Sequence, residues 1–246
     1  MTTNKFIQFR MCLITTIFFT SMMACSVSYI PSNKSRESSG NYYLFNPDTI
    51  LTDLAQGKTD LFIEKDGSFD PPLSEPVKVV QWSQGDYFRI AQAVHERFWN
   101  DAFSDWKLGN MYFTADCHQV EKGPQKGSFG LYRIIEPFFE KSGLEELIVI
   151  DPSTNSIWRS NKSLDPQAMP SVSIDFPRLR VTANNAFQMA EDNGGKGARL
   201  ANDNNCFATA LLAPNGGAKD WDVSYHNKDQ GDIFSIKIDE YTGMIK

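Results

Sequence analysis

Two stretches of eight residues, IDPSTNSI at 150–157 and IDEYTGMI at 238–245, share one pattern and decide the expected fold. Both begin with Ile-Asp, have a threonine at the fifth position and end with isoleucine. The sixth position, which follows the threonine, is where the chain is expected to bend. The bend position is Asn155 in the first copy and Gly243 in the second. Glycine adopts a positive φ at no steric cost, and asparagine is the best substitute. The pattern therefore predicts a strand, a tight left-handed turn and a return strand in each copy.

The sequence before each turn also repeats. LIVID (147–151) and FSIKID (234–239) have the composition of strands. Each follows two further strand-like stretches, which are NMYFTADC (110–117) with GLYRII (130–135) and CFATALLA (206–213) with WDVSYH (221–226). A helix is expected before each set, because Ser83 with Asp86 and Thr182 with Asn185 fit the capping-box pattern. Short strands, VKVVQW (77–82) and RLRV (178–181), are expected to lead into these helices.

These patterns predict an α+β fold of two tandem units, 77–160 and 178–246. Each unit is expected to be an antiparallel sheet with one helix packed on a face, in the order β-α-β-β-β. The alternative is that a common hairpin turn recurs by chance. An N-terminal segment with a linker at 44–76 and a second linker at 161–177 complete the body.

The N-terminus has the layout of a signal peptide. Lys5 and Arg10 supply positive charge before the apolar stretch MCLITTIFFT at 11–20. A membrane-spanning helix needs ~20 apolar residues, so this stretch is too short to span a bilayer comfortably. The layout predicts export from the cytoplasm.

The expected cleavage site follows directly. Ala24-Cys25 resembles a bacterial lipobox, so we expect removal of residues 1–24 and lipidation of Cys25. A plain secretory signal cut after Ser26 and an uncleaved anchor are the alternatives. Residues 25–43 would form a flexible tether. The protein is then expected in the cell envelope, outside the cytoplasm, with the membrane as a partner through the lipid anchor.

Composition and charge exclude some functions. The 246-residue chain is 41% hydrophobic and 22% charged, which is enough apolar material for a folded core. Its formal net charge is -6 and it has no basic block, so no nucleic-acid partner is expected. With three histidines in the chain, neither a metal site nor another cofactor is expected.

The second unit resembles a PepSY-like domain. The resemblance rests on the helix VTANNAFQMAEDNGG (181–195), the tryptophan-led strand WDVSYH and the ending FSIKIDEYTGMIK (234–246). The first unit is a divergent match, with Asn155 in place of the turn glycine. The chain also looks like bacterial lipoproteins that contain W-S/T-x-x-D-Y-x-R-I-A-Q-A, here Trp82 to Ala93. The resemblance implies an envelope protein without shared catalytic residues, and inhibition of a secreted peptidase.

Two cysteines remain in the body, Cys117 and Cys206. Outside the cytoplasm they are expected either to form a disulfide or to stay as two buried thiols. A catalytic thiol at Cys117 is disfavoured, because neighbouring strand residues such as His118 point to opposite faces.

Three other stretches invite a binding site. GGKGARL (194–200) is expected to be a helix end and turn rather than a phosphate loop, because its glycines follow a helix. ANDNNC (201–206) is expected to be a polar turn rather than a calcium loop, since the spaced ligand pattern is missing. The aromatic residues around the first helix exceed what one core stripe needs, and the expected binding patch is Tyr87, Phe98, Trp99, Phe103 and Trp106.

Taken together, the sequence predicts a non-catalytic binding or regulatory module that holds a peptide or an envelope protein. The alternative is a PepSY-type inhibitor or modulator of a secreted peptidase. An enzyme would need a cleft with convergent titratable groups, and no such set is evident in the sequence.

Overall fold

The computed structural model describes residues 41–65, 80–99, 102–135, 142–164, 170, 172–214, 219–227 and 231–246. They all belong to one structural unit, Ser39–Lys246. The predicted signal peptide at 1–24, the lipidation site Cys25 and most of the predicted tether lie outside the described residues.

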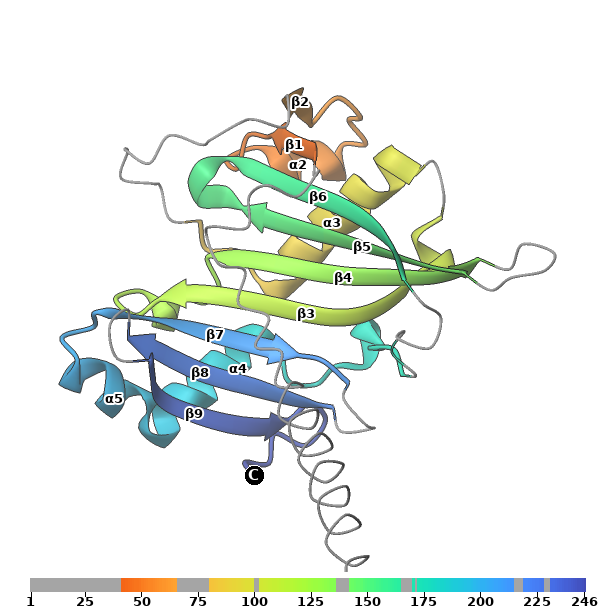
Figure 1. The fold of residues 1–246 in the computed structure, drawn as a ribbon. Coiled ribbons are helices and arrows are strands. Elements are labelled where there is room, and N and C mark those ends of the chain that lie inside the picture. Colours follow the sequence, from red (N-terminus) through yellow and green to blue (C-terminus); the bar gives the residue numbers. More distant parts are fainter. Residues whose placement is uncertain are drawn as a thin grey trace, which may run out of the picture. The chain divides into compact units, whose positions relative to one another are not determined.

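The fold is α+β and is built on a nine-stranded antiparallel sheet (Figure 1). The strand order across the sheet is β2-β1-β6-β5-β4-β3-β7-β8-β9. The strands are β1 (Asn41–Leu44), β2 (Ile63–Lys65), β3 (Lys107–Asp116), β4 (Lys126–Ile135), β5 (Ser142–Asp151), β6 (Ser156–Leu164), β7 (Cys206–Leu212), β8 (Asp220–Asn227) and β9 (Gly231–Asp239).

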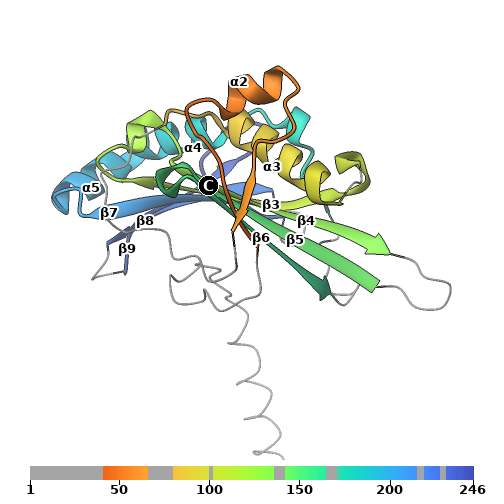
Figure 2. The same cartoon turned by 90° about the horizontal axis from the view of Figure 1, so that it is seen from above.

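The α-helices of the described chain lie on one face of this sheet (Figure 2). They are α2 (Ile50–Ala55), α3 (Gln84–Trp99), α4 (Ala183–Ala190) and α5 (Lys196–Ala201). A π-helical turn, Glu191–Gly195, joins α4 to α5, and short 3-10 turns occupy Phe103–Asp105, Val120–Lys122, Pro152–Thr154 and Phe176–Arg178. The core lies between the helices and the sheet, where the largest enclosed side chains include Tyr87, Phe113, Phe129, Phe187 and Trp221.

Both predicted capping boxes are confirmed. The Asp86 backbone N–H donates to Ser83 Oγ, and the Ser83 N–H donates back to the Asp86 carboxylate at 2.9 Å. The second helix repeats this arrangement with Thr182 and Asn185. These bonds satisfy backbone donors that a helix start leaves without a partner.

The two helix starts also bind each other. The Gln84 backbone N–H donates to Asn184 Oδ1 at 3.2 Å, and the Ala183 N–H donates to Gln84 Oε1 at 2.6 Å. Each helix thus receives an amide oxygen carried by the other, which favours the positive end of both helix dipoles. Residues about one hundred positions apart are fixed together in this way.

The predicted left-handed turns are confirmed at both positions. Asn155 has a φ of 52° and Gly243 has a φ of 72°. The aspartate before each turn accepts backbone N–H bonds, from Ser153 at Asp151 and from Tyr241 and Thr242 at Asp239. The return strand after Asn155 is β6, whereas Gly243 is followed by a single bridge between Ile238 and Ile245.

The predicted leading strands are not found. Residues 80–82 and 179–181 are outside any strand, and 77–79 lie outside the described residues. In the second case the backbone N–H groups of Arg180 and Val181 both donate to the Glu240 carbonyl. The segment therefore lies across the end of β9 and does not extend the sheet.

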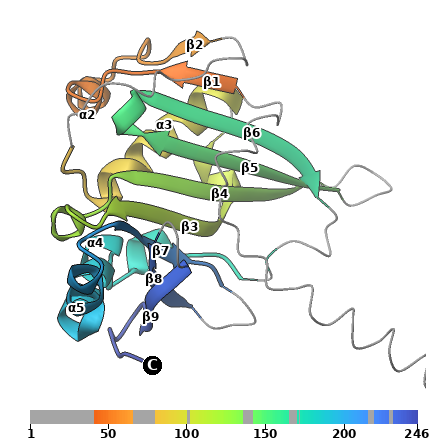
Figure 3. The ribbon, with the colours of Figure 1, turned by 60° about the vertical axis from the view of Figure 1, so that its left-hand side comes forward.

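The N-terminal part of the body belongs to the sheet, contrary to expectation. Asn41–Tyr43, assigned to the tether, begin β1, which pairs with β6 and carries β2 on its other side (Figure 3). The reason is packing, because Tyr43 is 1% exposed and its ring stacks on Phe98 at 4.1 Å. Similarly, Asn161–Leu164, assigned to a linker, continue β6 along β5.

The two predicted units share one continuous sheet. The strand that follows α3, β3, pairs with the strand that follows α5, β7, from Met111–Leu212 to Asp116–Phe207. The second helix is interrupted at Asn193 and Gly194, as predicted, and φ at Gly194 is 120°. The stretch after it, predicted to be a turn, instead forms a separate short helix, α5.

Candidate functional site

The predicted aromatic patch does not form one surface. Tyr87 is 0% exposed, lies in the first turn of α3 and packs edge-on against Trp82 and Phe113. Trp106 is also buried. Phe98, Trp99 and Phe103 are partly buried and pack against the core. Most of the excess aromatic residues therefore serve packing.

Four of the five aromatic residues surround a buried charge cluster, His95, Glu146 and Arg159. His95 Nδ1 lies 2.5 Å from Glu146 Oε2, and Arg159 Nε donates to Glu146 Oε1. The His95 ring packs edge-on against Phe103 and Trp106. The Arg159 guanidinium lies 5.3 Å from the ring centroids of both Phe98 and Trp99.

The buried charge cluster is enclosed. His95 and Glu146 are 0% exposed, and Arg159 is 8% exposed. It joins α3 to β5 and β6, and the carboxylate is held between two basic groups with no serine, threonine or cysteine among its hydrogen-bond partners in the described chain. His95 Nε2 and the indole nitrogens of Trp99 and Trp106 have no hydrogen-bond partner within the described residues. We interpret the cluster as a clamp between helix and sheet, because its three side chains are buried and link α3 to β5 and β6.

A second polar cluster ties the C-terminal half to the rest. The Arg199 guanidinium donates to Glu191 at 2.8 Å and to Glu121 at 2.7 Å, and the Tyr225 hydroxyl donates to Glu191 at 2.7 Å. The hydrogen bond with Glu191 raises the pKa of Arg199. Burial, and then the hydrogen bond with Glu191, raises the pKa of Tyr225.

Arg199 also binds the predicted polar turn at 201–206. Its Nη1 donates to Asn204 Oδ1 at 2.7 Å, and Asp203 and Asn204 adopt φ values of 51° and 56°. A guanidinium at this carbonyl oxygen opposes a cation there. The stretch is the turn that ends α5. Gly194 and Gly195 lie between α4 and α5, Gly197 lies inside α5, and the element before them is a helix, so this stretch does not form a phosphate loop.

Cys117 and Cys206 form a disulfide, with 5.4 Å between their Cα atoms. Cys117 directly follows the C-terminal end of β3, and Cys206 is the first residue of β7. Antiparallel pairing places these two strand ends side by side, so the cysteines meet although they do not occupy the same position in their strands. The Cys117 N–H donates to the Cys206 carbonyl, which closes the ladder at this point. His118 Nδ1 lies 3.0 Å from Asp116 Oδ1, and both cysteines of the described residues are held in the disulfide.

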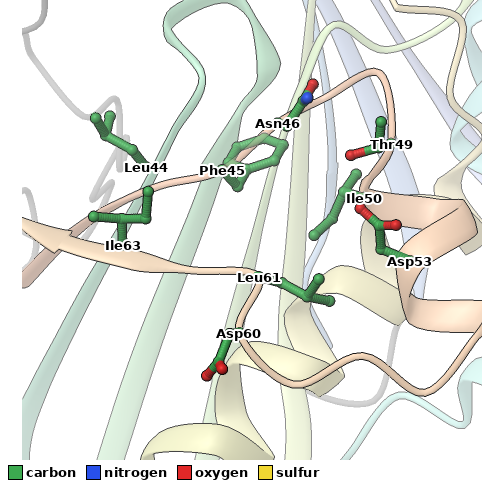
Figure 4. Close-up of a pocket in the computed structure, with 9 residues that line it drawn as sticks. All are labelled: Leu44, Phe45, Asn46, Thr49, Ile50, Asp53, Asp60, Leu61 and Ile63. Atoms are coloured by element: carbon green, nitrogen blue, oxygen red, sulfur yellow. The ribbon is translucent and has the colours of Figure 1, made fainter.

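An open pocket lies where the N-terminal segment folds over the end of the sheet (Figure 4). Its volume is about 310 Å³. We call it the edge pocket, and it is lined by Leu44, Phe45, Asn46, Thr49, Ile50, Asp53, Asp60, Leu61 and Ile63. The lining comes from the end of β1, from α2 with the turn before it, and from the stretch that leads into β2.

Local hydrogen bonds shape the edge pocket. Asn46 Oδ1 accepts the Asp48 N–H at 3.0 Å, and the Asn46 carbonyl accepts the N–H groups of Thr49 and Ile50. This turn reverses the chain between β1 and α2. Phe45 and Ile50 are buried at its base, whereas Ile63 is 63% exposed at its rim. The walls are therefore mainly apolar.

The charged groups that line the edge pocket are acidic. Lys58 Nζ contacts Asp53 Oδ1 at 2.6 Å, and this hydrogen bond lowers the pKa of Asp53. The Asp60 side chain is 93% exposed and lies 3.6 Å from Arg97 of α3. Neither Lys58 nor Arg97 lines the pocket. The pocket thus combines an apolar base with two carboxylates.

Comparisons with protein-family models, curated proteins and solved structures found no significant match to this chain. Within the described residues, no helix has the length and the hydropathy that a membrane span requires.

Proposed function

We propose that this protein is a lipid-anchored envelope protein that acts as a non-catalytic binding or regulatory module. Cys25 would carry the lipid, and the folded body would hold a peptide or protein partner outside the cytoplasm. The observation that supports binding most directly is the edge pocket, an open depression with apolar walls and acidic groups. Concave apolar sites with a few placed polar groups are the usual form of ligand sites.

The position of the edge pocket suits a tethered module. β1, whose last residue Leu44 lines the pocket, is also the first described element after the proposed tether. The disulfide, the buried charge cluster and the shared sheet hold the scaffold behind it together. A rigid scaffold with an open site at one edge supports a binding role.

The test has two parts. Metabolic labelling with a fatty-acid analogue should label the full chain and fail with Cys25→Ser. Affinity capture from solubilised envelopes with the full chain should enrich a partner that Leu61→Glu, a change in the edge pocket, no longer retains. Equal recovery with both proteins, or no enrichment, would argue against the proposal.

We further propose that the sheet consists of two copies of one helix-and-meander unit. The support is a matching register. In each half of the sheet, one row of directly paired residues runs from strand to strand. In the first half the row is Phe113, Gly127, Ile150 and Ile157. In the second half it is Leu212, Trp221, Ile238 and Ile245. In each row the last pair lies across the left-handed turn at Asn155 or Gly243.

In each half, a helix position and a strand position combine a large side chain with a small one, and the layer that carries the large side chain differs between the halves. Tyr87 and Ala186 occupy equivalent helix positions, because each is the fourth residue after the capping residue of its helix, Ser83 or Thr182. A Cβ on Gly127 would lie 3.0 Å from Tyr87, so the first half pairs a large helix residue with a glycine in β4. The second half has Ala186 in its helix and the fully buried Trp221 in β8. Exchange of volume between two layers is expected when copies of one unit diverge.

A PepSY-type inhibitor of a secreted peptidase is the second candidate. The features that carry this resemblance are packed together, since Trp221 Nε1 donates to the Val181 carbonyl at 2.9 Å. A Cβ on Gly243 would approach Met189 of α4 at 3.3 Å, which places the turn against the helix. The full chain in excess should then inhibit a secreted thermolysin-type peptidase, and undiminished cleavage of a standard substrate would remove this candidate.

A further inference from the structure

We infer that the edge pocket and the outer edge of β2 together bind an extended peptide segment, with a lysine or arginine side chain of that segment in the pocket. This inference rests on the proposed function and specifies its ligand. Three observations carry it, namely the position of β2, the contact of Ile63 with both features, and the charge of the lining.

The first observation is the position of β2 at the edge of the sheet. Within the described residues β2 pairs with β1, from Tyr42–Lys65 to Leu44–Ile63, and no strand lies on its other side. An edge strand presents unpaired backbone donors and acceptors that an extended peptide can complete. At the opposite edge, β9 already accepts a bridge from Ile245 and a hydrogen bond from the Lys246 N–H to the Lys237 carbonyl.

The second observation is that the strand and the pocket are continuous. Ile63 is the first residue of β2 and also lines the edge pocket, and Leu61 lines it two positions earlier. A peptide that pairs with β2 therefore passes the pocket mouth. Its side chains alternate between the two faces, so one of them can enter the pocket while its neighbours point away. Backbone bonds would supply general affinity and the pocket would supply specificity.

The third observation is the chemistry of the lining. Leu44, Phe45 and Ile50 offer apolar surface, whereas the charged lining residues are Asp53 and Asp60. A lysine or arginine side chain fits this combination, because its methylene stem packs on apolar surface and its charged end reaches a carboxylate. Lys58 and Arg97 contact these carboxylates from outside the lining, and Asp60 keeps 93% of its side chain accessible. An acidic side chain would find no cationic partner among the lining residues.

The test uses the full chain in detergent and three synthetic peptides of alternating apolar and polar residues. The central residue is lysine, norleucine or glutamate, and nothing else differs. Fluorescence anisotropy should show the lysine peptide binding about tenfold more tightly than the glutamate peptide, with norleucine between them. Asp60→Asn should reduce the lysine preference severalfold. The control Asp222→Asn removes a charge on β8, remote in the strand order, and should leave that preference unchanged.

Amide hydrogen exchange locates the contact. Alternate N–H groups of a strand point to opposite sides, so the lysine peptide should slow exchange at those N–H groups of Ile63, Glu64 and Lys65 that point away from β1. Equal binding of the lysine and glutamate peptides, an equal loss of preference in Asp222→Asn, or protection confined to other strands would overturn the inference. So would failure of all three peptides to bind. If the native partner still depends on Leu61 in that case, the proposed function stands and the peptide mode alone is rejected.

Discussion

Cys117 follows β3 and Cys206 begins β7, and the disulfide between them closes the seam along which the two halves of the sheet meet. The seam includes the β3–β7 strand pair, the contact between the two helix starts and the hydrogen bond from Arg199 to Glu121. The bond connects positions 89 residues apart, so it restricts a long loop of the unfolded chain.

We expect loss of this disulfide to lower stability substantially. Chain-entropy reasoning for a loop of this length gives about 4.6 kcal/mol as an upper value. The measurement is urea unfolding of Cys117→Ser/Cys206→Ser beside the wild type, with and without reductant. The variant should unfold at lower urea and ignore reductant, whereas the wild type should lose stability when reduced. Identical midpoints for the oxidised wild type and the variant would contradict this account.

The buried charge cluster gives a second prediction. Glu146→Gln leaves Arg159 buried without its counter-charge, and breaking a buried pair in this way costs about 3–5 kcal/mol. Glu145 is the neighbouring residue, on the other face of β5, where it contacts the exposed Lys162 at 2.7 Å. Glu145→Gln is therefore the matched control and should cost less than about 1 kcal/mol. Equal unfolding midpoints for the two variants would show that the cluster does not clamp α3 to the sheet.

Glu240 predicts how stability depends on pH. It is 1% exposed, and burial raises its pKa from 4.5 to about 7, with Asp239 and Asp220 acting in the same direction. The folded protein therefore binds more protons than the unfolded chain between these two pH values. Stability from this group is fully present below about pH 4.5 and is lost as the pH rises through 7, by at most about 3 kcal/mol.

Glu240→Gln tests this dependence. Subtracting the unfolding free energy of the variant from that of the wild type, at each pH from 4 to 8, isolates the contribution of the carboxyl group. The difference should fall with rising pH and level off above 7. A difference that stays constant over this range would mean that Glu240 titrates in the folded protein as it does in the unfolded chain.

The turn glycine supports a graded prediction. Gly243 has a φ of 72°, so Gly243→Asn should cost less than about 1 kcal/mol and Gly243→Val about 2 kcal/mol. Gly197 lies inside α5, where an added Cβ would meet open space, and Gly197→Ala should instead stabilise by about 0.5–1 kcal/mol. Thermal unfolding of the three variants gives the order. A tolerated valine at 243 would refute the left-handed turn.

Local sequence signals predicted the parts of the fold that depend on neighbouring residues. The caps at Ser83 and Thr182 and the bends at Asn155 and Gly243 each require particular residues at particular backbone angles, and each is found. The α+β class and the antiparallel pairing followed from the spacing of strands and short connections.

The remaining features depend on contacts between distant residues. Glu146 stands in LEELIV, where nothing distinguishes it from its solvated neighbour Glu145, and its partner His95 resembles the boundary residue of a helix. The aromatic run YYLF at 42–45 was the available signal for β1, but its pairing with β6 is not encoded locally. The edge pocket exists because α2 and β2 fold back over that strand, so no local motif marks it.

Site-specific photo-crosslinking in intact cells shows whether a partner occupies the edge pocket. A photoreactive aliphatic residue is placed at Leu61 in the pocket or, as control, at Ile134, an exposed aliphatic residue of β4. We expect a discrete protein adduct from position 61 that Asp60→Asn weakens, and no such adduct from position 134. Equal adducts from both positions, or none from position 61, would contradict this expectation.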